Sequence, residues 1–243
     1  MKRENSMIVD PSHSFLDMPL GEPFICSFSG GKDSVLALSL ASEKGNAKGL
    51  IHWSNKLTST STFHEQSISI VKQQALNLDL PLTITSFSPK EHRLELLKIY
   101  EDFASQGIKS IVFGDIYLMD SVKLQSILCK KAGLIPRYPL WERNYADLMR
   151  NINEHEIISI ISRINIEKLD SKWLGVAFNQ EVYQEFMKLD IDPFGENGEF
   201  HTTVVDGKIF KNPLKYSINT TENTSINLSI NYICLFDYLF IFS

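Results

Sequence analysis

Six consecutive residues near the start of the chain have the side chains and the backbone to hold a phosphate group. They are Ser29, Gly30, Gly31, Lys32, Asp33 and Ser34, and they lie between an apolar run at 24–28 and an apolar stretch with helical spacing. A glycine turn between a strand and a helix presents N–H groups at the helix N-terminus, where the helix dipole favours an anion. The serine hydroxyls add donors, Lys32 can neutralise charge, and Asp33 fits a Mg²⁺ ion that bridges it to phosphates.

The glycine spacing excludes two common phosphate-binding loops. One requires G-x-x-x-x-G-K-[ST] and the other requires G-x-G-x-x-G, whereas this segment has only the adjacent pair Gly30-Gly31, with Asp33 in place of Ser or Thr. A plain tight turn with Asp33 as a helix N-cap is the alternative. The position of all six residues between an apolar strand and an apolar helix favours a phosphate site of another kind.

A second group of reactive side chains lies in "GENGEFHT", residues 195–202. If residues 199–205 are extended, Glu199 and His201 share one face of the strand. A carboxylate and a histidine in that arrangement could orient and deprotonate a small nucleophile, and Glu196 with Glu199 could hold an ammonium ion. From the residues alone, a polar loop before a hairpin, with His201 at the surface, is an equally good interpretation.

The elements that position the first group alternate between strand and helix patterns from Pro23 to Gly133. Apolar runs predict strands at 24–28, 49–53, 82–87 and 110–116. Helices are predicted between them, with start signals at Thr62 and Ser88 and a third helix over 120–132. This alternation predicts an α/β fold with a doubly wound parallel sheet, whose ligands lie beyond the carboxyl ends of the strands. The polar segments 29–34, 52–55 and 114–120 all fall at such ends, so we expect them to converge.

The pattern changes after residue 134 and predicts a smaller α+β domain. We expect helices near 144–151 and 179–189, a strand near 157–164, and a hairpin that turns at Asp206-Gly207. The expected organisation is an N-terminal extension at 1–22, a domain at 23–133 that carries the phosphate-type loop, and a smaller domain at 134–215 that carries the second group of reactive side chains. Residues 216–243 are expected to form an irregular tail with a terminal strand. Within it, residues 217–231, rich in Ser, Asn and Thr, are expected to form a mobile loop or an irregular edge strand.

Composition narrows the possible partners. The net charge of −5 over 243 residues argues against broad binding of DNA, which needs a basic face. The three cysteines are far apart and form no C-x-x-C, so neither a disulfide framework nor a zinc site is expected. The N-terminus has no apolar signal-peptide region, and the apolar end "YICLFDYLFIFS" is too short to span a bilayer. We therefore expect a cytoplasmic protein that does not bind membranes.

Two motifs resemble known families. "SGGKDS" after a strand resembles the signature of the PP-loop (N-type) ATP pyrophosphatases of the adenine nucleotide alpha-hydrolase-like superfamily, which implies cleavage of ATP to AMP and pyrophosphate. "DPFGENGEFHTTVVDGKIF", residues 192–210, resembles the C-terminal signature of the diphthine–ammonia ligase family. "VFGDIYLMD" at 112–120 and "GLIPRYPLW" at 133–141 resemble further segments of that family, in the same order.

The resemblance implies ATP-dependent amidation with ATP and Mg²⁺ as cofactors. Its acceptor is a carboxylate on diphthine, a modified histidine of a translation elongation factor, and its nitrogen donor is ammonia. The implied ATP-binding residues are Ser29, Gly30, Gly31, Lys32, Asp33, Ser34, Gly114 and Asp115, with Asp33 also holding the metal. The implied acceptor-binding residues are Asn197, Gly198, Glu199 and His201. The implied catalytic residues are Lys32, Asp33, Glu196, Glu199 and His201, with Lys32 as a charge partner of the pyrophosphate.

The sequence departs from the family pattern on the acceptor side. Val176 stands where an arginine often follows the glycine, and Lys208 stands where a proline is usual. These departures leave ATP use intact and the acceptor open. A PP-loop enzyme acting on a small-molecule carboxylate or on tRNA, and a non-enzymatic ATP-binding sensor, remain as alternatives. A homodimer is also left open.

Overall fold

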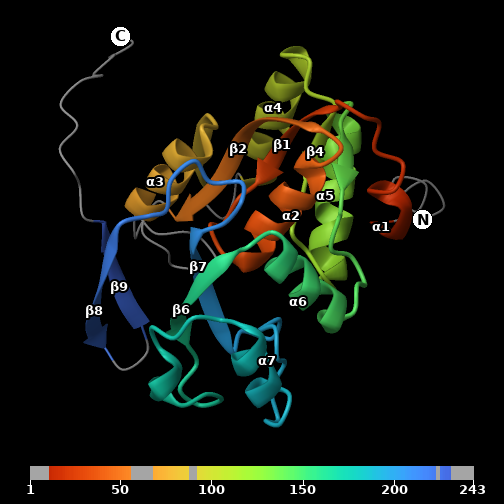
Figure 1. The fold of residues 1–243 in the computed structure, drawn as a ribbon. Coiled ribbons are helices and arrows are strands. Elements are labelled where there is room, and N and C mark those ends of the chain that lie inside the picture. The colour runs from red at the N-terminus through yellow and green to blue at the C-terminus, as the bar shows by residue number, and fades with distance from the viewer. Residues whose placement is uncertain (1–10, 56–67, 88–91, 223–224, 231–243) are drawn as a thin grey trace.

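Five parallel strands form the central sheet in the spatial order β3-β2-β1-β4-β5 (Figure 1). The computed structural model describes residues 11–55, 68–87, 92–222 and 225–230. The strands are β1 Pro23–Ser27, β2 Asn46–Asn55, β3 Leu82–Phe87, β4 Ser110–Val112 and β5 Ile135–Arg137. The order reverses direction between β1 and β4, which makes the carboxyl end of β1 the switch point of the sheet. The predicted doubly wound α/β fold is confirmed.

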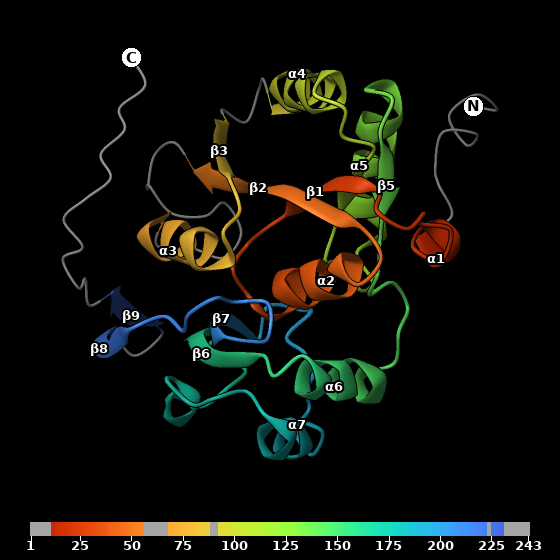
Figure 2. The same cartoon turned by 45° about the horizontal axis from the view of Figure 1, so that its top comes forward.

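Helices cover both faces of this sheet (Figure 2). On one face lie α2 Lys32–Ser42 and α3 Ile68–Leu78, and on the other lie α4 His92–Ser105 and α5 Met119–Lys131. Because successive side chains of a strand point to opposite faces, Phe24 and Cys26 of β1 belong to the apolar cluster of α2 and α3, whereas Ile25 belongs to that of α4 and α5. None of the helices in the described part of the chain has the length and apolar content that crossing a bilayer requires.

A smaller C-terminal domain packs against the α2 face of the central sheet. Its elements are α6 Tyr145–Glu154, β6 Ile158–Ile164, the short helix η2 Ser171–Trp173, α7 Gln180–Phe186, β7 Phe200–Asp206, β8 Tyr216–Glu222 and β9 Ser225–Ile230. The strands form an antiparallel sheet in the order β7-β6-β9-β8. One apolar cluster joins β1, α2, α6 and β7, so the two domains share a core. The predicted α+β character of this part is confirmed.

Three expectations about the C-terminal half are wrong. The domain boundary at 133/134 is too early, because β5 pairs with β4 and completes the first sheet. Residues 208–210, directly after the Asp206-Gly207 turn, form no strand. Instead β7 pairs with β6, and Phe210 turns back, donating its N–H to the Gly207 carbonyl and burying its ring. Residues 216–222 and 225–230 form the antiparallel β8–β9 hairpin, with β8 at the edge of the sheet. The alternation of apolar and polar residues over 226–230 is typical of a strand. The high Ser, Asn and Thr content of the segment favours irregular structure instead, and the expectation followed the composition. The expected terminal strand and the helix start signals at Thr62 and Ser88 lie outside the described residues.

Residues 11–22, the described part of the expected N-terminal extension, pack against the first domain. Helix α1, Pro11–Ser14, lies beside β5. Arg137 of β5 donates through Nε and Nη2 to the two carboxylate oxygens of Glu22, at 3.0 and 2.8 Å, and through Nη1 to the Ser14 carbonyl. The side chains of Arg137 and Glu22 are only 4% and 5% exposed. This fork-shaped pair holds residues 14–22 against the edge of the sheet.

Removing one partner of this pair is expected to destabilise the protein strongly. In Glu22→Ala the Arg137 charge stays buried without a carboxylate, which costs about 3–5 kcal/mol of unfolding free energy. Urea unfolding of the whole chain measures this cost. The matched control is Glu185→Ala, which removes a carboxylate paired with Lys188 at the surface, where an ion pair contributes about 0–1 kcal/mol. Equal costs for the two substitutions would contradict the structural role of the buried pair.

Candidate functional site

The loop 29–34 joins β1 to α2 at the switch point of the sheet. Gly30 has φ +82°, a conformation that favours glycine. Its N–H donates to Ser34 Oγ at 3.1 Å, and the Gly31 N–H donates to Ser29 Oγ at 3.3 Å. The Ser29 hydroxyl in turn donates to Ser34 Oγ at 3.1 Å. The predicted anion-binding groups are therefore brought together, and in this conformation the two hydroxyls accept the loop N–H groups themselves.

Strand β7 of the C-terminal domain is hydrogen-bonded to this loop. The Val204 N–H donates to the Gly30 carbonyl at 2.9 Å, and the Lys32 N–H donates to Thr202 Oγ1 at 3.0 Å. A Cβ on Gly31 would lie 3.0 Å from the Thr202 carbonyl oxygen, so the close approach of β7 explains the second glycine. Gln74 of α3 donates from Nε2 to the carbonyls of Gly30 and Val204, at 2.9 and 2.7 Å. The loop is thus held by both domains.

The carboxyl end of β4 brings a second carboxylate to the loop. A Cβ on Gly114 would lie 3.0 Å from the backbone of Asp33, so glycine is required for β4 to approach the first turn of α2. Asp115 follows directly. Burial raises the pKa of Asp115 to about 6, and the Asp33 charge adds to that rise, against hydrogen bonds from Ser121 and from its own backbone. Asp33 Oδ1 is buried and, among the described residues, has no hydrogen-bond partner.

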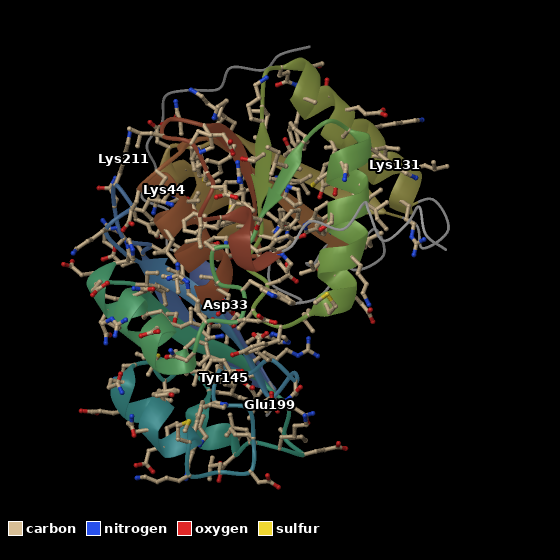
Figure 3. All side chains as sticks on the ribbon, turned by 90° about the vertical axis from the view of Figure 1, so that its right-hand side faces the viewer. Asp33, Lys44, Lys131, Tyr145, Glu199 and Lys211 are labelled. Atoms are coloured by element: carbon tan, nitrogen blue, oxygen red, sulfur yellow. The ribbon has the colours of Figure 1, made fainter. Side chains whose placement is uncertain are left out.

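Glu196 approaches the same place from the C-terminal domain. Burial raises the pKa of Glu196 to about 8; the charges of Asp33, Asp192 and Asp115 add to the rise, and that of Lys32 opposes it. Figure 3 shows Asp33 at the junction of the domains, with Tyr145 and Glu199 on the side of the C-terminal domain. The structure therefore gathers Asp33, Asp115 and Glu196, all three predicted from the sequence, around the N-terminus of α2.

Glu199 shapes the loop that carries Glu196. Its side chain is buried, and its oxygens accept hydrogen bonds from the Asp192 N–H at 3.3 Å, the Asn197 N–H at 3.0 Å and Lys168 Nζ at 3.4 Å. Asn197 and Gly198 form the exposed turn of this loop, where Gly198 has φ +77°. The carboxylate predicted to be catalytic is thus already engaged by backbone and lysine donors.

His201 lies on the other side of β7. Its neighbours Phe200 and Thr202 both face the N-terminus of α2, since the Phe200 ring contacts Lys32 Nζ and Thr202 accepts from the Lys32 N–H. Side chains alternate along a strand, so His201 points to the opposite face, beside Arg163 of β6. The structure does not bring His201 into the group formed by Asp33, Asp115 and Glu196.

Two residues at this junction, Tyr145 and Asp192, were not predicted from the sequence. Tyr145 donates its hydroxyl to Asp192 Oδ2 at 2.5 Å, and its ring stacks on Phe194 at 4.5 Å between centroids. Tyr117 meets the Tyr145 ring edge-on, and burial, together with the charges of Asp192, Glu196 and Glu142, raises the pKa of Tyr117. Asp192 opens the "DPFGENGEFHT" motif and could have been noticed there. Tyr145 has no sequence signal, because only packing brings it to the site.

The predicted polar segment 52–55 supports the entry to the loop. His52 is buried, and its Nδ1 lies 2.7 Å from the Phe28 carbonyl, which fixes a proton on Nδ1 because a carbonyl can only accept. Burial lowers the pKa of His52, so the ring is neutral. Trp53 Nε1 donates to Ser27 Oγ at 2.9 Å. Both side chains thus fix the last residues before the loop.

The side chain of Lys32 extends into the C-terminal domain and also pairs with its neighbour Asp33. Nζ donates to the Phe194 carbonyl at 2.6 Å and to Asp33 Oδ2 at 2.9 Å. Within the described ranges, no three His, Cys, Asp or Glu side chains are grouped so that they could hold a metal ion by themselves. A metal at Asp33 would therefore need further ligands from a bound phosphate.

Comparison with known proteins relates both domains to one family. The family model described as "Diphthamide synthase N-terminal domain" matches residues 24–136, and that described as "Diphthamide synthase C-terminal domain" matches residues 144–230. Among curated proteins, the diphthine–ammonia ligases of Rattus norvegicus and Homo sapiens are each 32% identical to this chain. The matches cover 54% and 50% of this chain and 49% and 46% of the relatives. The chain thus spans about half the length of the curated relatives it matches.

Two solved structures are similar at low identity. A predicted subunit of a tRNA methyltransferase from Methanocaldococcus jannaschii aligns with a TM-score of 0.44 and 17% identity, over 77% of this chain and 98% of that one. A U34-tRNA thiolase from Methanococcus maripaludis aligns with a TM-score of 0.39 and 13% identity, over 64% of this chain and 61% of that one.

The two family models together cover most of the described chain; the first ends within β5 and the second begins just before α6. This chain therefore belongs to the diphthamide synthase family.

Proposed function

We propose that this chain is an ATP-dependent ligase that adenylates a substrate carboxylate and amidates it with ammonia, releasing AMP and pyrophosphate. The proposal is carried by one observation. Asp33 of the loop 29–34 and Asp115, which follows β4, lie close to Glu196 of the C-terminal domain. The relatives named diphthine–ammonia ligase support diphthine on an elongation factor as the acceptor.

The residues of the loop fit the phosphates of ATP. The amides of 30–32 lie at the N-terminus of α2, and neither Gly31 nor Gly114 has room for a Cβ. Phosphate oxygens would replace the Ser29 and Ser34 hydroxyls as acceptors of the loop N–H groups. Asp33 Oδ1, which lacks a described partner, suits Mg²⁺, because this ion is usually held by one or two carboxylates together with substrate phosphates. When bound, Mg²⁺ would supply positive charge that stabilises the departing pyrophosphate.

The opposite side of the junction suits ammonium. Asp192 and Glu196 are half-buried carboxylates, and a cation close to them would relieve their mutual repulsion. The pKa of Glu196, raised to about 8, makes its ionised form a stronger base than an ordinary carboxylate, and a bound ammonium ion would favour that ionised form. Tyr145 orients Asp192 through its hydrogen bond. We assign Glu196 the role of proton acceptor and Asp192 the role of binding the ammonium ion.

The two departures from the family pattern lie away from the loop. Val176 donates its N–H to the Trp173 carbonyl and accepts from the Ile161 N–H, as part of the C-terminal core. Lys208 donates to the Glu154 carbonyl at the end of α6 at 2.6 Å. Neither substitution removes a group from the loop 29–34, so both are compatible with ATP binding. The identity of the acceptor has to be determined by assay.

The deciding assay supplies Mg-ATP, ammonium and either the diphthine-bearing elongation factor or a series of small carboxylates. AMP and pyrophosphate are the expected nucleotide products, with the amide formed on the true acceptor. Formation of ADP and phosphate would refute the reaction class. Firm ATP binding without turnover on any acceptor would favour an ATP sensor.

Asp33→Asn tests the metal role of the loop aspartate. The substitution keeps the size of the side chain but removes the charge that would bind Mg²⁺, so pyrophosphate release is expected to fall roughly 100-fold or more. Circular dichroism should remain that of the unsubstituted protein. Asp79→Asn, at an exposed aspartate paired with Lys211, is the control and should retain activity. Wild-type pyrophosphate release in Asp33→Asn would contradict the assignment.

Glu196→Gln tests whether the raised pKa of Glu196, the proposed proton acceptor, makes the stability of the protein depend on pH. The pKa of Glu196 is raised from 4.5 to about 8, so the stability that its neutral form contributes is present below pH 4.5 and is lost as the pH rises to 8. Glutamine stays neutral throughout. The Tm of Glu196→Gln, relative to the unsubstituted protein, should therefore rise between about pH 5 and pH 8 and then level off. Thermal melts without ATP measure this, with the exposed Glu185→Gln as the control; a difference independent of pH would argue against the raised pKa.

A further inference from the structure

The ammonium group of Lys32 is enclosed mainly by the C-terminal domain, and its one partner within its own loop is Asp33. Nζ lies 5.7, 5.2 and 5.4 Å from the ring centroids of Phe178, Phe194 and Phe200. It also donates to the Phe194 carbonyl at 2.6 Å. Only 4% of the side chain is exposed.

These three rings form an aromatic cage that is part of the C-terminal core. Phe178 lies 5.7 Å from Phe194 and 5.4 Å from Phe200 between centroids. The face of an aromatic ring attracts a cation, and a buried charge also requires polar partners. The Phe194 carbonyl and Asp33 Oδ2 provide them. The cage therefore accommodates Lys32 with all its interactions made within the protein.

The backbone of Lys32 is bound to the same domain. Its N–H donates to Thr202 Oγ1, so one residue reaches β7 through its backbone and the 192–199 loop through its side chain. The side chain has carbonyl, carboxylate and aromatic partners within the protein. Lysine is thus used here as a link between the domains.

We propose that Lys32 is a positioning residue that holds the loop 194–199 against Asp33, and that it is not a ligand of the ATP phosphates. The inference rests on the proposed function, because it is Glu196 in this loop that the link brings to the loop 29–34. It replaces the interpretation of Lys32 as the charge partner of pyrophosphate.

The internal bonds of the loop explain why an outside link is needed. The Phe194 N–H donates to Asp192 Oδ1, and the Asn197 N–H donates to Glu199 Oε2. These bonds fix the shape of the loop but connect it only to residues of its own domain. The bond from Lys32 to the Phe194 carbonyl joins the start of the loop to the N-terminus of α2. Without it, the amides of the loop should exchange with solvent more readily.

Chemical footprinting of the unsubstituted chain tests the position of Lys32 directly. Reductive methylation followed by mass spectrometry should leave Lys32 unmodified both without and with Mg-ATP. Lys188 and Lys211, which are 65% and 62% exposed, should be modified in both conditions. Modification of Lys32 in the free protein that ATP then prevents would overturn the proposal.

Lys32→Met tests the link, because methionine fills the cage without a charge. Hydrogen exchange of the 194–199 amides should become roughly tenfold faster, while the Kd for Mg-ATP stays within about threefold of the unsubstituted value. Lys32→Arg, which keeps the cation, should restore part of the protection. A Kd raised tenfold or more with unchanged loop exchange would instead identify Lys32 as a phosphate ligand.

Lys44→Met is the matched control. Lys44 Nζ also lies over a phenylalanine, 4.9 Å from the Phe15 centroid, and donates to a backbone carbonyl, that of Leu16. It lies away from Asp33 (Figure 3), so its substitution should leave loop exchange unchanged. If the unsubstituted chain binds no ATP, the proposed function fails, yet exchange and footprinting still decide where Lys32 lies. If Lys32→Met does not fold, the footprint of the unsubstituted chain decides alone.

Discussion

The carbonyl of Gly30 is the point on which the arrangement of the two domains depends. It accepts hydrogen bonds from the Val204 N–H of the C-terminal domain and from Gln74 Nε2 of α3. A buried carbonyl must find partners, and here both partners come from outside the loop. The loop therefore takes its shape from strand β7 and helix α3 as much as from its own glycines. Gly31 is needed for the same reason, because a Cβ there would meet the Thr202 carbonyl.

The junction concentrates negative charge that the fold alone only partly balances. Asp33, Asp115 and Glu196 approach one another from three separate segments, and the pKa of both Asp115 and Glu196 is raised. Lys32 lowers the pKa of Glu196 but shares its charge with Asp33. Burial is the main cause of both rises, and the charge of a further cation nearby would favour the ionised forms and lower these pKa values. The proposed reaction needs two cations, Mg²⁺ and ammonium, and either would supply positive charge close to these carboxylates.

Local patterns predicted the elements, whereas contacts between distant segments decided the site. The alternation of apolar strands and helices identified the parallel sheet, and "SGGKDS" identified its switch point. The contacts of Lys32 with Thr202 and of Gln74 with Val204 join residues 170 and 130 positions apart, and no local pattern reports such a pairing. For the same reason the direction of the Lys32 side chain, the role of Tyr145 and the outward face of His201 required the structure. Glu199 was predicted as a catalytic and substrate-binding residue, whereas its hydrogen bonds within the folded loop required the structure.

The contact between Val204 and Gly30 also has a consequence for the second sheet as a whole. Strand β7 is the first strand in the order β7-β6-β9-β8, and an edge strand with unpaired backbone groups can recruit a strand from another molecule. On β7 the N–H and the carbonyl of Val204 are occupied by Gly30 and Gln74. The loop 29–34 and Gln74 thus occupy the backbone groups of Val204 at this edge of the sheet. Within the described residues, the other edge of the antiparallel sheet is β8, separated from this loop by β6 and β9.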